Sequence, residues 1–452
     1  MTVVPPVRSA FKGPFPPGPR SWVPGSNLRA MQRDPLGFLT RIAREFGDVV
    51  HFTFGPQHLY LINEPDLIRE VLVTKERAFM KGRALQRTKL LLGEGLLTSE
   101  GDFRLHETAF HRDRIARYAE GMRANAERVA ESWRDGQTMD VAQEMTRLTL
   151  SIVAQTLFGA DVSSEADEIG RALTELMEVF TVLLNPFTQW LMKLPTPKMR
   201  STQRAIERLD ATIYRMIEQR RASGVDRGDL LSMLLLAQDE GEVMTDRQVR
   251  DEAMTLFLAG HETTANALAW TFYLLAQNPH VEIGDGTHAR MVLAESMRLY
   301  PPAWIIGRLA LENVEIGGYT IPRGAIVIVS QYVTHRDPRY WPEPEKFDPE
   351  RFRDEDPSPG PAARGPTSPG GRGRREAAGE GISRPKFAYF PFGGGSRICI
   401  GEGFAWTEGV IVLQTLARKW RLSLAQSTPV IPKPVITLRL RGGIKMTAHA
   451  RH

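Results

Sequence analysis

A single cysteine sets the tightest limit on what this chain can be. Cys399 is the only cysteine among 452 residues, and it lies in a glycine-rich stretch, residues 390–401, that reads FPFGGGSRICIG. Consecutive glycines let the backbone take conformations closed to other residues and approach a bulky group closely. Residues 402–420 follow with helical spacing, so Cys399 lies just before a helix N-terminus, where unpaired amides and the helix dipole favour a negatively charged sulfur. The stretch therefore predicts a loop that holds a thiolate against a large, flat group.

Five positions of this loop resemble the haem-binding signature of the cytochrome P450 family, in which a cysteine thiolate holds the haem iron. They are Phe392, Gly395, Arg397, Cys399 and Gly401. The resemblance implies haem b (iron protoporphyrin IX) as the cofactor, with Cys399 as the metal ligand. The alternative is a structural cysteine, because a lone cysteine is usually a small buried hydrophobe. Two further motifs favour the haem.

The first of these motifs lies in the middle of an expected helix over residues 245–277. Residues 259–264 read AGHETT, and glycine and threonine cost stability inside a helix, which suggests a functional site. Gly260 leaves room for a flat ligand and dioxygen, a threonine hydroxyl can bond to a helix carbonyl or a bound oxygen species, and a glutamate can supply protons. The motif resembles the family's oxygen-activation motif, with Glu262 as the acid and Thr263 as the hydroxyl. The alternative is a helix with a packing glycine.

The other motif is Glu295 and Arg298, which stand three positions apart on one face of an expected helix and can therefore pair. Residues 347–352 read FDPERF, and this order along the chain resembles the family's Glu-Arg-Arg network, with Arg351 as the third member. The implied role is structural: a buried ion-pair network that fixes the cysteine loop. Loss of one member would strand a buried charge.

Two arginines are candidates for binding the haem propionates. Arg308 lies ten positions after Arg298, where many relatives of the family have a cation, and Arg397 lies in the cysteine loop. Arginine suits bidentate recognition of a carboxylate.

Three segments depart from the family's pattern. Residues 103–110 are short and lack the tryptophan that contacts a propionate, which bears on haem retention; Arg104 and His106 are the substitutes considered, and neither is assigned. Residues 280–288 are too short for the usual helix, so altered packing or stability is expected there. Residues 354–383 are rich in Gly, Pro, Ser and Arg without periodicity, which predicts a disordered insertion. A passive insertion and a surface that captures an acidic electron donor both remain open for it.

The composition is that of an ordinary globular chain, 42% hydrophobic and 25% charged. A net charge of +5 is too small to indicate nucleic acid. No segment reaches the roughly 18–20 apolar residues of a membrane span, and residues 1–24 hold seven prolines and no apolar core. They resemble the proline-rich segment that follows the anchor in eukaryotic relatives. One cysteine excludes an internal disulfide and is consistent with the cytosol. A soluble, cytoplasmic monomer is expected.

The periodicity predicts a mainly α fold with a small β region, in one domain over residues 1–452. Thr245 and Gln248 have capping-box spacing at the start of the long helix. Helices are expected at 35–46, 64–74, 141–158, 198–221, 245–277, 290–299 and 402–420. Strands are expected at 49–54, 58–63, 325–330 and 435–440, with a hairpin at 314–321.

The resemblance implies a monooxygenase that inserts one oxygen atom of O2 into a hydrophobic small molecule. Fatty acids, terpenoids and steroid-like molecules are all open as substrates. No flavin-binding domain follows, so the electrons are expected from a separate ferredoxin or flavodoxin with its reductase. One alternative is a peroxide-driven peroxygenase, against which Glu262 and Thr263 argue because a peroxygenase needs no proton relay for dioxygen. Another is a non-catalytic haem-thiolate protein, which the three departures motivate.

Overall fold

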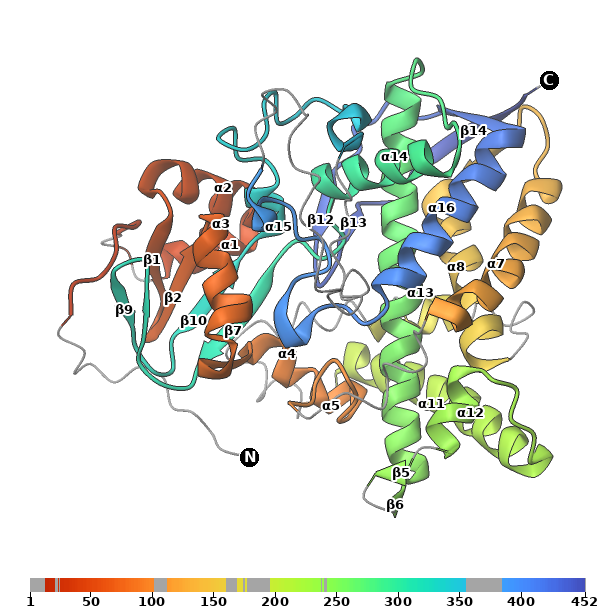
Figure 1. Ribbon diagram of the computed structural model, residues 1–452, viewed down its shortest axis with the longest axis horizontal. Coiled ribbons are helices and arrows are strands. Elements are labelled where there is room, and N and C mark those ends of the chain that lie inside the picture. The colour runs from red at the N-terminus through yellow and green to blue at the C-terminus, as the bar shows by residue number, and fades with distance from the viewer. Residues whose placement is uncertain are drawn as a thin grey trace, which may run out of the picture.

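A strand-rich part and a larger helical part lie side by side in the computed structural model (Figure 1). The structure describes residues 13–20, 23, 25–100, 112–159, 169–173, 175–176, 196–236, 238–239, 242–354 and 384–451. Most of these residues are helical and the sheets are small, so the expected mainly α fold is confirmed.

The largest sheet joins segments from distant parts of the chain. Its strands run in the order β1-β2-β10-β7-β3. They are β1 (Val49–Phe54), β2 (Gln57–Ile62), β10 (Ile326–Val329), β7 (Ile306–Ala310) and β3 (Phe79–Lys81). β1 and β2, both expected as strands, pair antiparallel, β10 pairs with β2 in parallel, and β7 pairs with both β10 and β3. The antiparallel β3–β7 pair sets Lys81 opposite Arg308.

The helix α13 (Asp246–Gln277) runs through the helical part and is the longest helix of the described residues. Thr245 and Gln248 make both hydrogen bonds of the predicted capping box. Most of its side chains are buried, because other helices surround it, as a helix that crosses a core requires. Its helical neighbours include α8 (Val141–Phe158), α11 (Pro197–Ser223), α14 (Gly286–Leu299) and α16 (Glu402–Lys419).

The other elements of the described residues are short or pack around these two parts. The remaining helices are α1 (Ser26–Arg33), α2 (Pro35–Phe46), α3 (Pro65–Arg69), α4 (Arg83–Arg87), α5 (Lys89–Leu92), α7 (Arg112–Ser132), α12 (Leu230–Leu236) and α15 (Gln331–Thr334). Short 3₁₀ or π turns are η1 (Glu70–Thr74), η2 (Glu76–Ala78), η3 (Pro349–Phe352), η5 (Lys386–Ala388) and η6 (Gly395–Arg397). The small sheets pair β11 (Trp420–Leu424) with β14 (Lys445–Ala450) and β14 with β4 (Thr138–Asp140), β12 (Pro432–Pro434) with β13 (Leu438–Leu440), β8 (Val314–Ile316) with β9 (Tyr319–Ile321), and β5 (Gln238–Asp239) with β6 (Glu242–Val243).

Three expected elements differ in the structure. The helix expected at 64–74 is α3 followed by the π turn η1. The helix expected to begin at residue 290 begins at Gly286, because the Asp285 side chain accepts a hydrogen bond from the backbone N–H of His288 and caps it there. The strand expected at 435–440 is wrong in its first half, where the Val435 N–H donates to the Thr437 carbonyl and turns the chain between β12 and β13.

The main hydrophobic core lies around α13, α8, α7 and α16, and a second core lies against the large sheet. No helix within the described ranges has the length and apolar character needed to cross a membrane.

Candidate functional site

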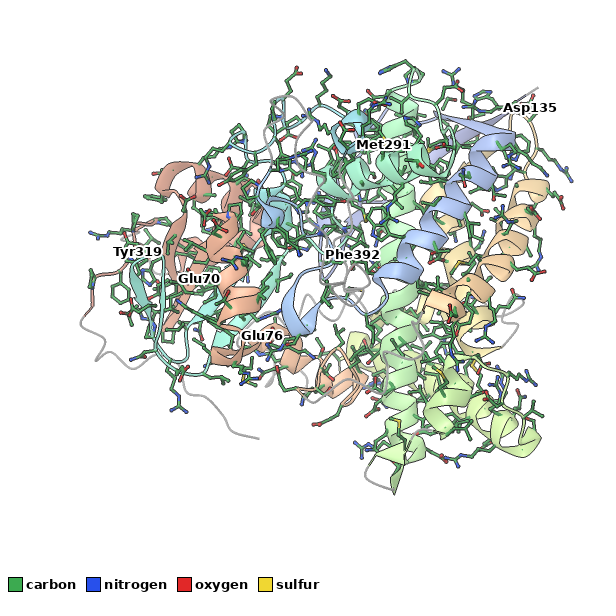
Figure 2. The ribbon with its side chains drawn as sticks, in the orientation of Figure 1. Glu70, Glu76, Asp135, Met291, Tyr319 and Phe392 are labelled. Atoms are coloured by element: carbon green, nitrogen blue, oxygen red, sulfur yellow. The ribbon has the colours of Figure 1, made fainter. Side chains whose placement is uncertain are left out.

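The cysteine loop, residues 390–401, is held in place by its own backbone and by the turns η1 and η2. The Cys399 N–H donates to the Phe392 carbonyl at 3.0 Å, and the Ser396 N–H donates to the Glu76 carboxylate at 2.7 Å. Gly395 has a φ of 74°, and a Cβ at this position would lie 1.9 Å from the Leu72 carbonyl oxygen. Only glycine meets both conditions. Figure 2 labels Glu76 and Phe392, with Phe392 near the centre of the molecule.

Cys399 is accessible at its surface and yet lies deep in the protein. Its side chain is exposed, but burial and the nearby Glu402 raise the pKa of its thiol to about 11, and a hydrogen bond with the Gly401 backbone lowers it only in part. A side chain with both properties faces an interior space rather than bulk water. A metal ion would supply the positive charge that a thiolate requires in such a place.

The middle of α13 presents an accessible strip to such a space. Residues 251–258 are buried without interruption, whereas Ala259 is exposed and Gly260 and Thr263 are partly exposed. These three share one helix face by their spacing. The Thr263 hydroxyl donates to the Ala259 carbonyl at 2.8 Å. The next residue, Thr264, interacts with Glu408 of α16, so the strip lies beside the helix that follows Cys399.

Glu262 does not share this face with Thr263. Its buried carboxylate pairs with Arg439 of β13, whose Nε lies 2.7 Å from Oε1 and whose Nη2 lies 2.7 Å from Oε2. The Thr437 hydroxyl also donates to Oε1. Sequence reasoning missed Arg439 and Thr437, because the pairing joins residues far apart in the chain. The only signal was that both lie in the strand expected at 435–440.

Arg308 is buried with little to pair with. Its side chain is on β7 and only 7% of the residue is exposed. Among the described residues its hydrogen bond is a long one, 3.3 Å from Nη1 to the Gly307 carbonyl. Burial, followed by the positive charge of Arg397, lowers its pKa to about 10. A buried guanidinium with so few hydrogen bonds is costly unless an anion pairs with it.

Arg397 lies close to this cation and is better satisfied. It donates to the Glu76 carbonyl at 3.2 Å, to the Phe79 carbonyl at 3.0 Å and to the Glu100 carboxylate at 3.1 Å. Glu100 also accepts the Lys81 N–H at 2.6 Å. Burial lowers the pKa of Lys81 to about 8, with Arg397 and Arg308 among the charges that add to the shift. Sequence reasoning missed Lys81 and Glu100.

These observations fit a bound haem b. Cys399 offers one accessible sulfur ligand, and the strip on α13 leaves a face free of bulky side chains. Arg308 and Arg397 bring two guanidinium groups near each other, and haem b carries two propionate carboxylates that such groups bind well.

Glu295, Arg298 and Arg351 are brought together and are linked to the start of the cysteine loop through His335. Glu295 and Arg298 are both 0% exposed and pair twice, at 2.7 and 2.8 Å. Arg351 Nε lies 3.4 Å from Glu295 Oε1. Arg298 also donates to three carbonyls of the loop that leads to η3; they belong to His335, Pro344 and Lys346. The His335 ring in turn accepts the backbone N–H of Phe390, at the start of the cysteine loop.

Some predictions fall on residues outside the described ranges. They are the segment 103–110 with Arg104 and His106, the insertion from residue 355 to 383, and most of residues 1–24. Residue 354, the first of the expected insertion, is described at the end of a turn.

Comparison with known proteins agrees with the haem site that the geometry indicates. A family model described as cytochrome P450 matches residues 16–283 and 287–446. The chain is 36% identical over 451 residues to cyclooctatin synthase of Streptomyces melanosporofaciens, covering 93% of this chain and 92% of that protein. It is 33% identical to cyclooctat-9-en-7-ol 5-monooxygenase of the same organism, covering 90% and 91%. It is 31% identical to pentalenene oxygenase of Streptomyces avermitilis, covering 92% and 94%.

Proposed function

The chain belongs to the cytochrome P450 family, whose members are oxidoreductases that bind haem b through a cysteine thiolate, and on that premise we propose that Cys399 ligates the iron and that the substrate is a terpenoid. One observation carries the assignment of the ligand. The Cys399 thiol is accessible but deep, at the end of a loop in which Gly395 tolerates no side chain.

The protein's own residues hold the cofactor and prepare the site. Arg308 and Arg397 bind the propionates, which gives Arg308 the anion that its buried guanidinium requires. Gly260 adds no side chain to the accessible strip of α13, and a Cβ there would lie 3.1 Å from the buried Val153 of α8, so glycine also suits the packing of α13 against α8. The bound haem supplies the chemistry of dioxygen activation, with a thiolate ligand that favours O–O cleavage.

Thr263 and Glu262 manage protons around that chemistry. The Thr263 hydroxyl lies on the accessible strip, and its present acceptor is a helix carbonyl. It can turn from that carbonyl to a ligand on the strip. Glu262 is the acid of the pair, held one residue away on another face by Arg439.

The substrate class is proposed from the relatives. Two of them are named as a pentalenene oxygenase and a cyclooctat-9-en-7-ol monooxygenase, so both act on alkene-containing, largely apolar compounds. We place this chain's substrate in the same terpenoid class, ahead of fatty acids and steroid-like molecules. The electrons come from a ferredoxin or flavodoxin with its reductase, and the enzyme works as a cytoplasmic monomer.

The test of the haem assignment is an absorption spectrum of the purified protein, reduced and exposed to carbon monoxide. A strongly red-shifted Soret band is expected for the native chain. Cys399→Ser should lose the shift, while Cys399→His should bind haem with an unshifted band, because nitrogen replaces sulfur as the ligand. Native protein that binds haem without the shift would overturn Cys399 as the ligand.

The reaction is tested with a surrogate ferredoxin and reductase, NADPH and a panel of cyclic terpene hydrocarbons and alcohols. Product that carries one atom of ¹⁸O from labelled O2 is expected. The same panel is run with hydrogen peroxide and no reductase to test the peroxygenase alternative. A peroxide-driven reaction needs no proton relay for dioxygen, so it would not depend on Glu262 and its partner Arg439. Product with peroxide but none with O2 and the reductase would replace the monooxygenase with a peroxygenase, and product under neither condition would remove the catalytic role.

A further inference from the structure

One face of α13 is fastened to the turn between β12 and β13. Glu262, Asn266 and Trp270 follow one another at intervals of four, so they share that face. Each of them bonds to the β13 segment. Asn266 Nδ2 donates to the Thr437 hydroxyl at 3.3 Å, and Trp270 Nε1 donates to the Leu438 carbonyl at 2.9 Å. The acid of the oxygen motif is therefore the end of a row of contacts with a segment more than 150 positions away in the chain.

At Glu262 the contact is an ion pair that uses both carboxylate oxygens. Arg439 faces Oε1 with Nε and Oε2 with Nη2, each at 2.7 Å, and Thr437 adds a hydroxyl hydrogen bond to Oε1. Glu262 is buried, and the Arg439 side chain is 18% exposed. Fork-shaped pairing of this kind fixes the orientation of a carboxylate as well as its charge.

The neighbouring residues of the motif are fixed in other directions. His261 Nδ1 lies 2.7 Å from the Phe257 carbonyl, and the His261 carbonyl accepts the Thr149 hydroxyl at 3.0 Å. Thr263 bonds to the Ala259 carbonyl on the accessible strip. The backbone at Glu262 therefore has little freedom to rotate, and the side chain's position depends on Arg439.

We propose that Arg439 is a positioning residue for the oxygenation reaction: it pairs with both oxygens of the Glu262 carboxylate and fixes its orientation, and it acts on proton delivery only through Glu262. The proposal rests on the proposed function, since it assigns Glu262 to the proton supply. Loss of the cation would leave a buried carboxylate unpaired, and such a group takes up a proton more readily and stays neutral at higher pH. Turnover that depends on the carboxylate would then need a higher pH.

The test uses the haem-loaded full chain with Arg439→Gln and, as matched control, Arg441→Gln. Arg441 lies two positions along the chain, with an exposed side chain. Two activities are measured: product formation with O2 and the surrogate ferredoxin, and product formation with hydrogen peroxide. For Arg439→Gln we expect O2-driven product to fall by about tenfold or more at pH 7, as loss of a positioned acid–base group does. Peroxide-driven product should stay within about twofold, as measured for each variant against native protein.

The pH profile separates positioning from a structural role. For Arg439→Gln the acidic limb of the O2-driven profile should move to higher pH, and the loss should shrink at pH 9. Arg439→Lys returns the positive charge without the fork-shaped pairing, so it should restore the position of the acidic limb but only part of the activity. Thr437→Val keeps the side chain's shape and removes the hydrogen bond to Glu262 together with the one accepted from Asn266, and it should give a smaller shift in the same direction. If Arg439→Gln yields too little haem-loaded protein, the Thr437→Val variant replaces it in the test.

A double-variant cycle gives the decisive outcome. If Arg439 acts through Glu262, then Arg439→Gln in a Glu262→Gln background costs no further O2-driven activity. Additive losses would overturn the proposal, and so would equal losses of the O2-driven and peroxide-driven reactions, which indicate a structural role. Failure of the proposed function itself is a different result, because native protein would then lack O2-driven product.

Discussion

At the scale of single residues, the site contains charges whose burial makes sense only with a partner. Arg308 is the main example, since a mostly buried guanidinium with one long hydrogen bond is costly in a bare protein. Arg397, by contrast, has a carboxylate and two carbonyls. The two arginines should therefore respond differently to haem, with Arg308 gaining more from the cofactor.

Arg308→Met should weaken haem binding while leaving the rest of the protein intact. A hydrogen bond to a charged group contributes about 1.5–3 kcal/mol, so haem should dissociate about 10- to 100-fold faster. The rate is measured by transfer of haem from the variant to an excess of an acceptor protein. Arg323→Met, at an exposed position before β10, is the control and should leave the rate unchanged. An Arg308→Met protein that keeps haem as long as the native chain would exclude Arg308 from the propionate site.

Glu408 should make the enzyme less stable as the pH rises. Burial raises the pKa of its carboxyl well above the ordinary value of 4.5, and the Thr264 side chain opposes this shift only in part. The folded protein thus keeps a proton that the unfolded chain loses above pH 4.5, so the free energy of unfolding falls as pH rises above that value. Glu408→Gln removes this dependence. It should be more stable than native protein by about 1 kcal/mol or more at pH 8, with little difference near pH 4.5.

The measurement is chemical unfolding of both proteins at several pH values. His449→Gln, at an exposed position of β14, is the control for general effects of pH. A native curve parallel to that of Glu408→Gln would mean that Glu408 is ionised in the folded protein.

The sequence predicts these residues to different degrees. Cys399, Arg308 and the Glu295–Arg298 pair lie within local motifs, so short spacings were enough to select them. The Glu262–Arg439 pair, the bond from Ser396 to Glu76 and the neighbourhood of Lys81 with Arg308 depend on how distant segments meet. Nothing in a local pattern encodes such meetings, so these contacts could be found only in the folded structure.

At the scale of elements, the cysteine loop docks on η1 through a glycine that has two separate reasons to be there. Gly395 has a positive φ, and its neighbour Leu72 leaves no room for a Cβ. Gly442 offers a comparison, since its φ is 79° but nothing lies within 4 Å of where its Cβ would be. Substitutions at these two glycines therefore separate the cost of backbone strain from the cost of a steric clash.

Gly442→Ala should cost about 1–2 kcal/mol, the usual penalty for a side chain in the left-handed region. Gly395→Ala should cost clearly more and should reduce haem content, because the loop must move away from the Leu72 carbonyl. Urea unfolding and the ratio of haem to protein are the measurements. Equal costs for both variants would mean that the loop is not seated on η1 as described.

Helix and strand predictions succeeded where one signal dominated. Residues 35–46, 49–54 and 141–158 have a clear period and clear end signals, and their elements match in both bounds. The segment 64–74 has helical periodicity, but only the backbone shows that η1 widens into a π turn beneath the cysteine loop. At 435–440 the alternating pattern predicted a continuous strand, but residues 435–437 form a turn that places Thr437 within hydrogen-bond distance of Glu262.

At the scale of the whole molecule, the cysteine loop joins the strand-rich part to the helical part. It contacts η1 on one side, and on the other it continues directly into α16, which packs against α13 and α7 (Figure 1). The residues expected to contact the haem come from both parts. Arg308 belongs to the large sheet, and the accessible strip belongs to α13. A haem bound among them would contact both parts.

Removal of haem should therefore loosen the molecule unevenly. A ligand that binds only the folded state stabilises it, and the loss is greatest in the segments that contact the ligand. Hydrogen exchange of haem-loaded and haem-free protein should show faster exchange in the cysteine loop, in β7 and around residues 259–263. β1 with β2, and β11 with β14, should exchange at nearly the same rate, because their pairing lies within one part. Uniform acceleration in every segment would show instead that haem stabilises the fold as one unit, and the view of two parts joined by the cofactor would be wrong.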